Sequence, residues 1–172
     1  MWVQVPPPAP MKIIKTFGNK EDREYSERIS VRAVVANNDK VIILHSKKNK
    51  FYELPGGGVD NSESLENAVL REVLEETGYI SEIAEEVGSI QEYINEIDLY
   101  KVTYCFLCTI LDQDNRKPTL SDPEDNEKEN IQTSLANAIE LISTSEISNN
   151  PIAKYSKERD ICFLGVLNKV HF

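Results

Sequence analysis

The sequence predicts an α+β protein in which a mixed β-sheet is flanked by helices. Five segments with strand-like composition predict the sheet, and helical patterns stand between and after them. A chain of 172 residues is long enough for one well-buried core and short for two. We therefore expect a single domain over residues 11–172, with residues 1–10 as a disordered, proline-rich lead.

The first half of the predicted sheet follows from short β-branched runs and the turns between them. Met11 to Phe17 predicts a short edge strand, and Gly18 to Arg28 is a polar connection. Ile29 to Ala36 and Val41 to His45 are strand-like. The Asn37-Asn38-Asp39-Lys40 segment between them is typical of a turn, so these two strands are expected to form a hairpin.

The second half of the chain supplies the centre of the sheet and two helices. Ile80 to Glu92 predicts a strand with a bend. Tyr100 to Leu111 is almost continuously apolar or aromatic and is expected at the centre of the sheet. Asp112 to Asn130 is acidic and contains prolines, which predicts a long mobile loop. Ser134 to Ser143 and about Ile152 to Val170 predict the last two helices.

The stretch from Gly57 to Tyr79 carries the strongest indication of function. On a helix, Glu72, Glu75 and Glu76 stand at i, i+3 and i+4, so their carboxylates share one face. Mg²⁺ takes oxygen ligands from a few carboxylates and keeps positions open for waters and phosphates. The alternative is a solvated acidic face, which is the usual meaning of a charge run. The residues around the three glutamates favour the metal-binding interpretation.

These residues resemble the Nudix box, G-x5-E-x7-R-E-U-x-E-E-x-G-U, in which U is a bulky aliphatic residue. The matching positions are Gly57, Glu63, Arg71, Glu72, Val73, Glu75, Glu76 and Gly78. The last position departs from the pattern, since Tyr79 stands where the box has an aliphatic residue. The resemblance is specific over the box and looser from about Ser30 to Ile142. It implies the Nudix α/β/α sandwich.

The resemblance also implies a reaction and roles for the box residues. Nudix enzymes hydrolyse a nucleoside diphosphate linked to another moiety, X, with Mg²⁺ or, as an alternative, Mn²⁺. The implied metal ligands are Glu72, Glu75, Glu76 and the backbone carbonyl of Gly57. Arg71 is implied to hold the carboxylates in place as part of the catalytic set. Glu63 and Gly78 are implied to be structural.

The general base stays open between the box and the acidic loop. Glu72 is the candidate within the box. The loop supplies the acids Glu124, Asp125, Glu127 and Glu129. Glu127 and Glu129 are our choice among these, because they stand nearest to the following element. For each loop acid the alternative is a solvated side chain without a catalytic role.

The substrate is less defined than the reaction. No proline lies between Pro55 and Pro118, so the proline typical of ADP-ribose-cleaving relatives is missing. Tyr93 and Tyr100 are candidates for stacking a nucleobase, with a position in the core as the alternative. A nucleoside triphosphate, an oxidised one included, or a nucleotide sugar fits the pattern. The competing function is a catalytically idle Nudix-fold sensor or regulator that binds a nucleotide, which the complete set of charged box positions disfavours.

Composition limits the partners and the compartment. The formal net charge of −10 argues against binding nucleic acid through broad phosphate neutralisation, but not against a small nucleotide. Three cysteines without a framework spacing indicate a reducing, cytoplasmic environment. Cys105 and Cys108, three apart on a strand, would face opposite sides and are expected to be buried thiols. We expect no signal peptide and no membrane span, and a homodimer stays open.

Overall fold

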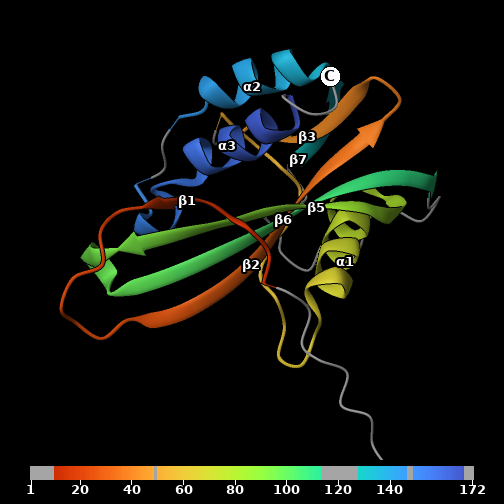
Figure 1. The fold of residues 1–172 in the computed structure, drawn as a ribbon. Helices are drawn as coiled ribbons and strands as arrows, with labels where there is room; N and C mark the ends of the chain where they lie inside the picture. The colour runs from red at the N-terminus through yellow and green to blue at the C-terminus, as the bar shows by residue number, and fades with distance from the viewer. Residues whose placement is uncertain (1–9, 49, 114–127, 147–148, 169–172) are drawn as a thin grey trace, which may run out of the picture.

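The computed structural model describes residues 10–48, 50–113, 128–146 and 149–168, which form three layers (Figure 1). A seven-stranded sheet lies in the middle, with helix α1 on one face and helices α2 and α3 on the other. This arrangement confirms the predicted α/β/α sandwich around a mixed sheet. The expected lead over residues 1–10 lies outside the described residues except for Pro10. No helix in the described part of the chain is long and apolar enough to span a bilayer.

The elements follow one another in the expected order, with two additional strands, β4 and β7. The strands are β1 (Ile13–Phe17), β2 (Ser26–Asn37), β3 (Lys40–Ser46), β4 (Phe51–Glu53), β5 (Tyr79–Ile94), β6 (Leu99–Gln113) and β7 (Lys128–Thr133). The helices are α1 (Leu65–Thr77), α2 (Leu135–Ser143) and α3 (Ser156–Asn168), with short 3-10 turns at Asn95–Ile97 and Pro151–Ala153. The final helix therefore begins later than the predicted start near Ile152, which lies in the second 3-10 turn.

The sheet order is β1-β5-β6-β2-β3-β4, with β7 added to β3. Strand β6 lies inside the sheet, antiparallel to β5 and parallel to β2, which confirms its predicted central place. Strands β2 and β3 form the predicted antiparallel hairpin, and β1 is the predicted edge strand. The bend predicted in β5 corresponds to irregular register against β6 between Ile80 and Gly88.

Strand β7 corrects the prediction of one long loop from Asp112 to Asn130. Strand β6 continues to Gln113, and β7 begins at Lys128 and pairs antiparallel with β3. Residues 114–127 lie outside the described residues. The β7 sequence KENIQT is too polar to predict a strand from its composition, and its strand state depends on pairing with β3.

Two hydrophobic clusters hold the layers together. The cluster under α1 includes Ala68, Val69 and Val73 of the helix with Val31, Ala33, Val35 and Phe106 of the sheet. The cluster under α2 and α3 includes Leu135, Ala138, Ile142, Phe163, Leu164 and Leu167 with Val34, Ile43 and Ile90. Cys105 belongs to the second cluster and Cys108 to the first, so the two thiols are buried on opposite faces as predicted. Burial raises the pKa of both thiols.

Candidate active site

Helix α1, which carries the box glutamates, is capped at both ends. The Ser64 side chain caps the start of the helix by accepting a hydrogen bond from the Asn67 amide at 3.1 Å. Gly78 ends it in the left-handed region at φ 76°, and its amide donates to the Leu74 carbonyl. Because the apolar face of α1 packs on the sheet, Glu72, Glu75 and Glu76 are held at the margin of that packing.

The loop before α1, here residues 55–58, is hydrogen-bonded to the backbone of strand β2. The Ala33 amide donates to the Pro55 carbonyl at 2.8 Å, and the Val31 amide donates to the Gly57 carbonyl at 2.9 Å. Gly56 has φ 145°, and a Cβ there would collide with the Val31 carbonyl oxygen, so only glycine fits this crossing. The Gly57 carbonyl, implied as a metal ligand, therefore already accepts one hydrogen bond and keeps one lone pair.

Arg71 connects this loop to the glutamates of the helix. Its guanidinium donates to both carboxylate oxygens of Glu63, each at 2.9 Å, in a bidentate pair. It also donates to Glu72 Oε1 at 2.8 Å, to Glu75 Oε2 at 3.3 Å and to the Gly58 carbonyl at 3.1 Å. The hydrogen bonds that Arg71 donates to Glu63 and Glu72 raise the pKa of Arg71, so the guanidinium is a permanent positive charge at this point.

The three box glutamates differ in exposure. The side chain of Glu75 is 36% exposed, that of Glu72 is 13% exposed and that of Glu76 only 8%. Burial raises the pKa of Glu72. Burial and the neighbouring charge of Glu53 raise the pKa of Glu76 to about 8. Glu76 Oε2 accepts the Gly56 amide at 2.7 Å, which binds the helix to the loop a second time.

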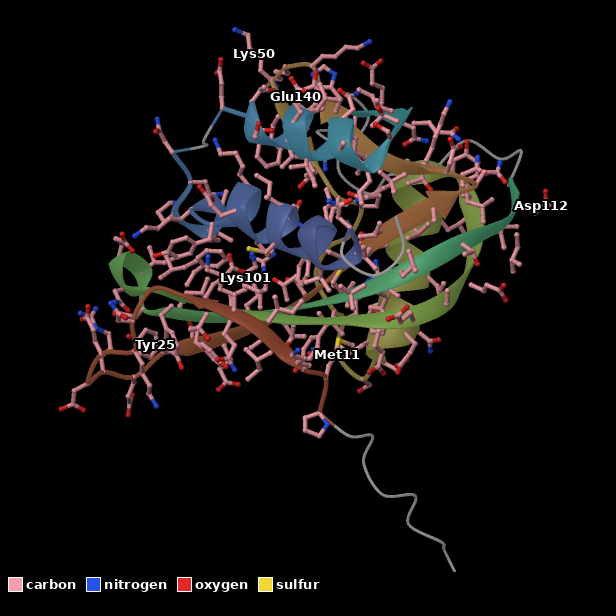
Figure 2. All side chains as sticks on the ribbon, turned by 45° about the horizontal axis from the view of Figure 1, so that its top comes forward. Met11, Tyr25, Lys50, Lys101, Asp112 and Glu140 are labelled. Atoms are coloured by element: carbon pink, nitrogen blue, oxygen red, sulfur yellow. The ribbon has the colours of Figure 1, made fainter. Side chains whose placement is uncertain are left out.

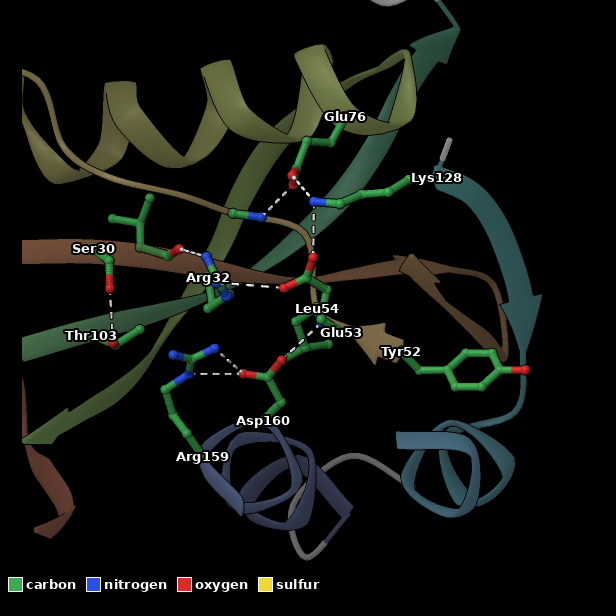
Figure 3. A network of polar contacts seen from close by, with 12 residues as sticks. Ser30, Arg32, Tyr52, Glu53, Leu54, Glu76, Thr103, Lys128, Arg159 and Asp160 are labelled. Carbon is green, nitrogen blue, oxygen red and sulfur yellow. Dashed lines mark hydrogen bonds and ion pairs between the residues drawn. The ribbon is translucent and has the colours of Figure 1, made fainter. Parts of the chain in front are cut away.

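A second group of charges lies next to Glu76 and was missed from the sequence (Figure 3). Lys128 of β7 places its ammonium 2.9 Å from Glu53 Oε1 and 3.5 Å from Glu76 Oε1. Arg32 of β2 lies 3.7 Å from Glu53 on the other side. Burial acts to raise the pKa of Glu53, but the charges of Arg32 and Lys128 outweigh it and hold that pKa below its ordinary value. In the sequence, only its position two residues before Pro55 indicates that Glu53 lies at this site.

Glu129, chosen as a candidate base, points away from the box. It stands opposite His45 in the β3–β7 ladder, and its carboxylate contacts His45 Nδ1 at 3.1 Å and Lys47 Nζ at 2.7 Å. Successive strand residues face opposite sides of a sheet, so Glu129 and Lys128 cannot both face the box. The structure brings Lys128 to the glutamates and leaves Glu129 on the other face. Glu127, the other choice, lies outside the described residues.

The two candidate stacking tyrosines pack against one another at one end of strands β5 and β6. Tyr93 and Tyr100 are cross-strand partners in β5 and β6, and their rings stack at 4.8 Å between centroids. Tyr25 packs edge-on against Tyr93. Each tyrosine lines a separate pocket: that of Tyr93 contains no residue of the box, and that of Tyr100 contains Leu65 and Glu66 at the start of α1 but none of Glu72, Glu75 and Glu76. Both rings are half-buried and contact one another, so stacking on a nucleobase stays a prediction for these two residues.

A pocket of about 200 Å³ lies directly beside the loop. Gly57 and Gly58 form part of its wall. Its other charged and aromatic lining residues are Arg28, Arg32, Phe51, Glu53 and Lys101. Arg28, Arg32 and Lys101 can each donate hydrogen bonds, and the two arginines are positive, which suits this pocket to phosphate or to other groups rich in hydrogen-bond acceptors.

Buried charged side chains between the sheet and α3 contact the pocket and the segment before the loop. Figure 2 shows Lys101 between the sheet and α3, where its ammonium lies 3.3 Å from Glu92. Burial and the neighbouring charge of Arg159 lower the pKa of Lys101 to about 7. Asp160 pairs with Arg159 at 2.9 Å and accepts the Leu54 amide at 2.9 Å, immediately before the loop begins (Figure 3). Helix α3 thereby fixes the position of the loop.

The donor atoms at this site fit a hard divalent cation. Glu72, Glu75, Glu76 and Glu53 offer carboxylate oxygens only, which is the ligand set that Mg²⁺ prefers. The missing Cβ of Gly57 lets Glu72 approach the loop closely. Within the described residues no three acidic, histidine or cysteine side chains are already arranged around a common point. The carboxylate oxygens are instead bonded to Arg71, to Lys128 and to the Gly56 amide. The glutamates fit a metal ion once the ion replaces some of these partners.

Comparison with known proteins gives relatives of more than one activity. The chain is 38% identical over 73 residues to an ADP-ribose pyrophosphatase of Methanocaldococcus jannaschii, covering 40% of this chain and 43% of that protein. It is 49% identical over 47 residues to a putative 8-oxo-dGTP diphosphatase of Bacillus subtilis (strain 168), covering 27% and 32%. The matched region thus spans less than half the length of either relative.

Similarity to solved structures extends over most of the chain. The solution structure of the E. coli ORF135 protein has a TM-score of 0.59 at 19% identity, covering 85% of this chain and 91% of that one, which is a likeness of fold. Residues 26–155 match the family model of the NUDIX domain, and this region includes the box, the loop and the pocket lining except Ser156. The chain therefore belongs to the NUDIX domain family.

Proposed function

We propose that this protein hydrolyses the diphosphate linkage of a nucleoside diphosphate joined to a second moiety, with a divalent metal ion held by the glutamates of α1. The observation that carries the proposal is the ordered carboxylate group of Glu72, Glu75 and Glu76 beside a cation-lined pocket. A metal site next to a phosphate-binding pocket is the arrangement that hydrolysis of a phosphoanhydride needs.

The box side chains and the Gly57 carbonyl would hold Mg²⁺, or Mn²⁺ as the alternative. When bound, the ion neutralises charge on the phosphate oxygens and activates water. Arg71 keeps Glu72 and Glu75 oriented, and its bidentate pair with Glu63 fixes the guanidinium itself. Glu72 is the better candidate for the base, because it lies at the site and burial raises its pKa, whereas Glu129 lies on the other face of the sheet.

The pocket beside the loop would take the part of the nucleotide that extends from the diphosphate. Arg28, Arg32 and Lys101 can donate hydrogen bonds to it, and Phe51 offers an aromatic surface. A nucleoside triphosphate, an oxidised one included, and a nucleotide sugar both satisfy these donors. The names of the two relatives point to ADP-ribose and to 8-oxo-dGTP, so both compounds belong in a substrate test.

The second candidate function is a sensor or regulator that binds a nucleotide without hydrolysing it. Such a module has no need for an arginine that positions three glutamates. Arg71 contacts Glu63, Glu72 and Glu75 at once, which favours the catalytic function.

A panel of nucleotides separates the two functions. ADP-ribose, UDP-glucose, dGTP and 8-oxo-dGTP are incubated with Mg²⁺, with Mn²⁺ or with EDTA, and the products are separated by anion-exchange chromatography. We expect a nucleoside monophosphate from at least one compound in the presence of a metal and none with EDTA. Saturable binding of a compound without any product, under both metals, would support the sensor instead.

We also propose a reducing, cytoplasmic location. Cys105, Cys108 and Cys162 are all free thiols, and the first two are buried in the core. A homodimer stays open and is tested by the mass measured in solution by light scattering.

A further inference from the structure

Lys128 places a positive charge between Glu53 and Glu76, beside the candidate metal ligands of α1. Its side chain is 20% exposed, and its ammonium lies between Glu53 Oε1 at 2.9 Å and Glu76 Oε1 at 3.5 Å. Figure 3 shows the lysine extending from β7 toward the glutamate of α1. Glu53 and Glu76 are 15% and 8% exposed, so a cation between them offsets a repulsion that water screens poorly.

The lysine and a divalent cation would compete for the same carboxylate. Glu76 Oε2 already accepts the Gly56 amide, and Lys128 is the partner of Oε1. A metal ion on Glu76 therefore brings a double positive charge close to an ammonium that is 3.5 Å from the shared oxygen. Two cations that share one carboxylate oxygen repel one another strongly in a partly buried site.

The surroundings allow the lysine side chain to leave while the strand stays in place. Asn130 of β7 donates to the Thr77 carbonyl at 2.8 Å, which binds the strand to the end of α1. Glu53 keeps Arg32 as a second cation at 3.7 Å. The four-carbon stem of lysine is flexible, so its ammonium can swing out without moving the backbone.

We propose that Lys128 is an internal counter-cation that holds Glu53 and Glu76 in the metal-free protein and is displaced when a divalent cation binds. Lys128 thereby lowers the affinity of the site for the metal. This inference rests on the proposed function, since it requires Glu76 to be a metal ligand. Lys128 is a positioning residue in this scheme and takes no part in the reaction.

The test measures Mn²⁺ binding by titration calorimetry on the full-length protein. Lys128→Met removes the charge, and Lys47→Met is the matched control, because Lys47 pairs with Glu129 on the opposite sheet face. We expect Lys128→Met to bind Mn²⁺ about tenfold more tightly, which corresponds to about 1.4 kcal/mol. Lys47→Met should bind as the wild type does. Lys128→Gln, which also removes the charge, should show the same gain and decides the case in which Lys128→Met does not fold; Lys128→Arg keeps the charge and should show no gain.

Thermal unfolding gives a second readout. Metal-free Lys128→Met should melt below the wild type, because two poorly screened carboxylates lose their shared cation. Saturating Mn²⁺ should raise its melting temperature by more than it raises that of the wild type. Unchanged or weaker Mn²⁺ binding by Lys128→Met overturns the inference.

Glu76→Gln distinguishes this failure from failure of the proposed function. Loss of Mn²⁺ binding in Glu76→Gln, together with unchanged affinity in Lys128→Met, overturns the role of the lysine and leaves the metal site intact. Unchanged binding in Glu76→Gln overturns both, because Glu76 is then not a ligand.

Discussion

Gly57 and Glu72 lie so close together that position 57 has no room for a side chain. A Cβ at Gly57 would lie 2.5 Å from Oε1 of Glu72, the same oxygen that accepts the hydrogen bond from Arg71. A Cβ at Gly58, the next residue, would meet no heavy atom within 4 Å. The loop therefore leaves no space for a side chain between Gly57 and the Glu72 carboxylate, whereas Gly58 has that space.

Gly57→Ala should lower turnover by about 10- to 100-fold, because Glu72 must shift away from the loop and from Arg71. The melting temperature should change little, since the group that moves is the flexible end of a side chain. Gly58→Ala is the matched control and should keep the wild-type rate. Equal rates for the two variants would show that the contact between Gly57 and Glu72 has no catalytic role.

The position of the base is tested by two glutamine variants assayed together. Glu72→Gln should lower turnover by about 10²–10⁴, as expected for loss of a general base or of a ligand that activates water. Glu129→Gln should stay close to the wild type, because its carboxylate pairs with His45 and Lys47 on the other face of the sheet. The opposite order of rates would mean that β7 rearranges when substrate binds and that Glu129 is the base.

Asp160→Asn should lower the free energy of unfolding by about 3–5 kcal/mol, because it removes a charge from a buried pair and leaves Arg159 poorly compensated. Glu140→Gln, on the exposed side of α2, is the control with the same chemical change. Urea unfolding of both variants makes the comparison. If the two have the same stability, the buried pair does not anchor α3 to the segment before the loop.

Lys101 should make stability depend on pH. Its pKa is about 7 in the folded protein and 10.5 by the ordinary value, so between these limits the unfolded chain binds more protons. The free energy of unfolding contributed by this group therefore rises as the pH increases above 7. Urea unfolding of the wild type and of Lys101→Met at pH 6.5, 7.5 and 8.5 should show the wild type gaining stability relative to the variant. Parallel curves would mean that the ammonium stays charged over this range.

Much of the fold was predictable because it follows from local patterns. The box helix, the hairpin at Asn37–Lys40 and the central strand each depend on periodicity or turn residues within a few positions. Strand β7 was not predictable in this way, because its polar residues become a strand only against β3. That register also decides that Lys128 faces the box and Glu129 does not, a difference of one residue that composition cannot reveal.

The candidate site also has a part that local spacing predicts and a part that depends on contacts distant in the chain. The spacing of Glu72, Glu75 and Glu76 predicts their shared face. Glu53 and Lys128 join Glu76 only through contacts between β4, β7 and α1, which are distant in the chain. The stacking of Tyr93 on Tyr100 likewise depends on the register between β5 and β6, which periodicity along either strand does not show.

The decisive measurement is the release of nucleoside monophosphate from the best compound of the panel by the wild type and by Glu76→Gln, with Mg²⁺ and with EDTA. The wild type should be active with Mg²⁺ alone, and Glu76→Gln should be slower by at least about 10². The metal-free variant should melt at or above the wild-type temperature at pH 8, because burial raises the pKa of Glu76 to about 8 and the amide avoids that cost of ionisation. A folded Glu76→Gln protein that hydrolyses the compound at the wild-type rate would contradict the assignment of α1 as the metal-binding helix.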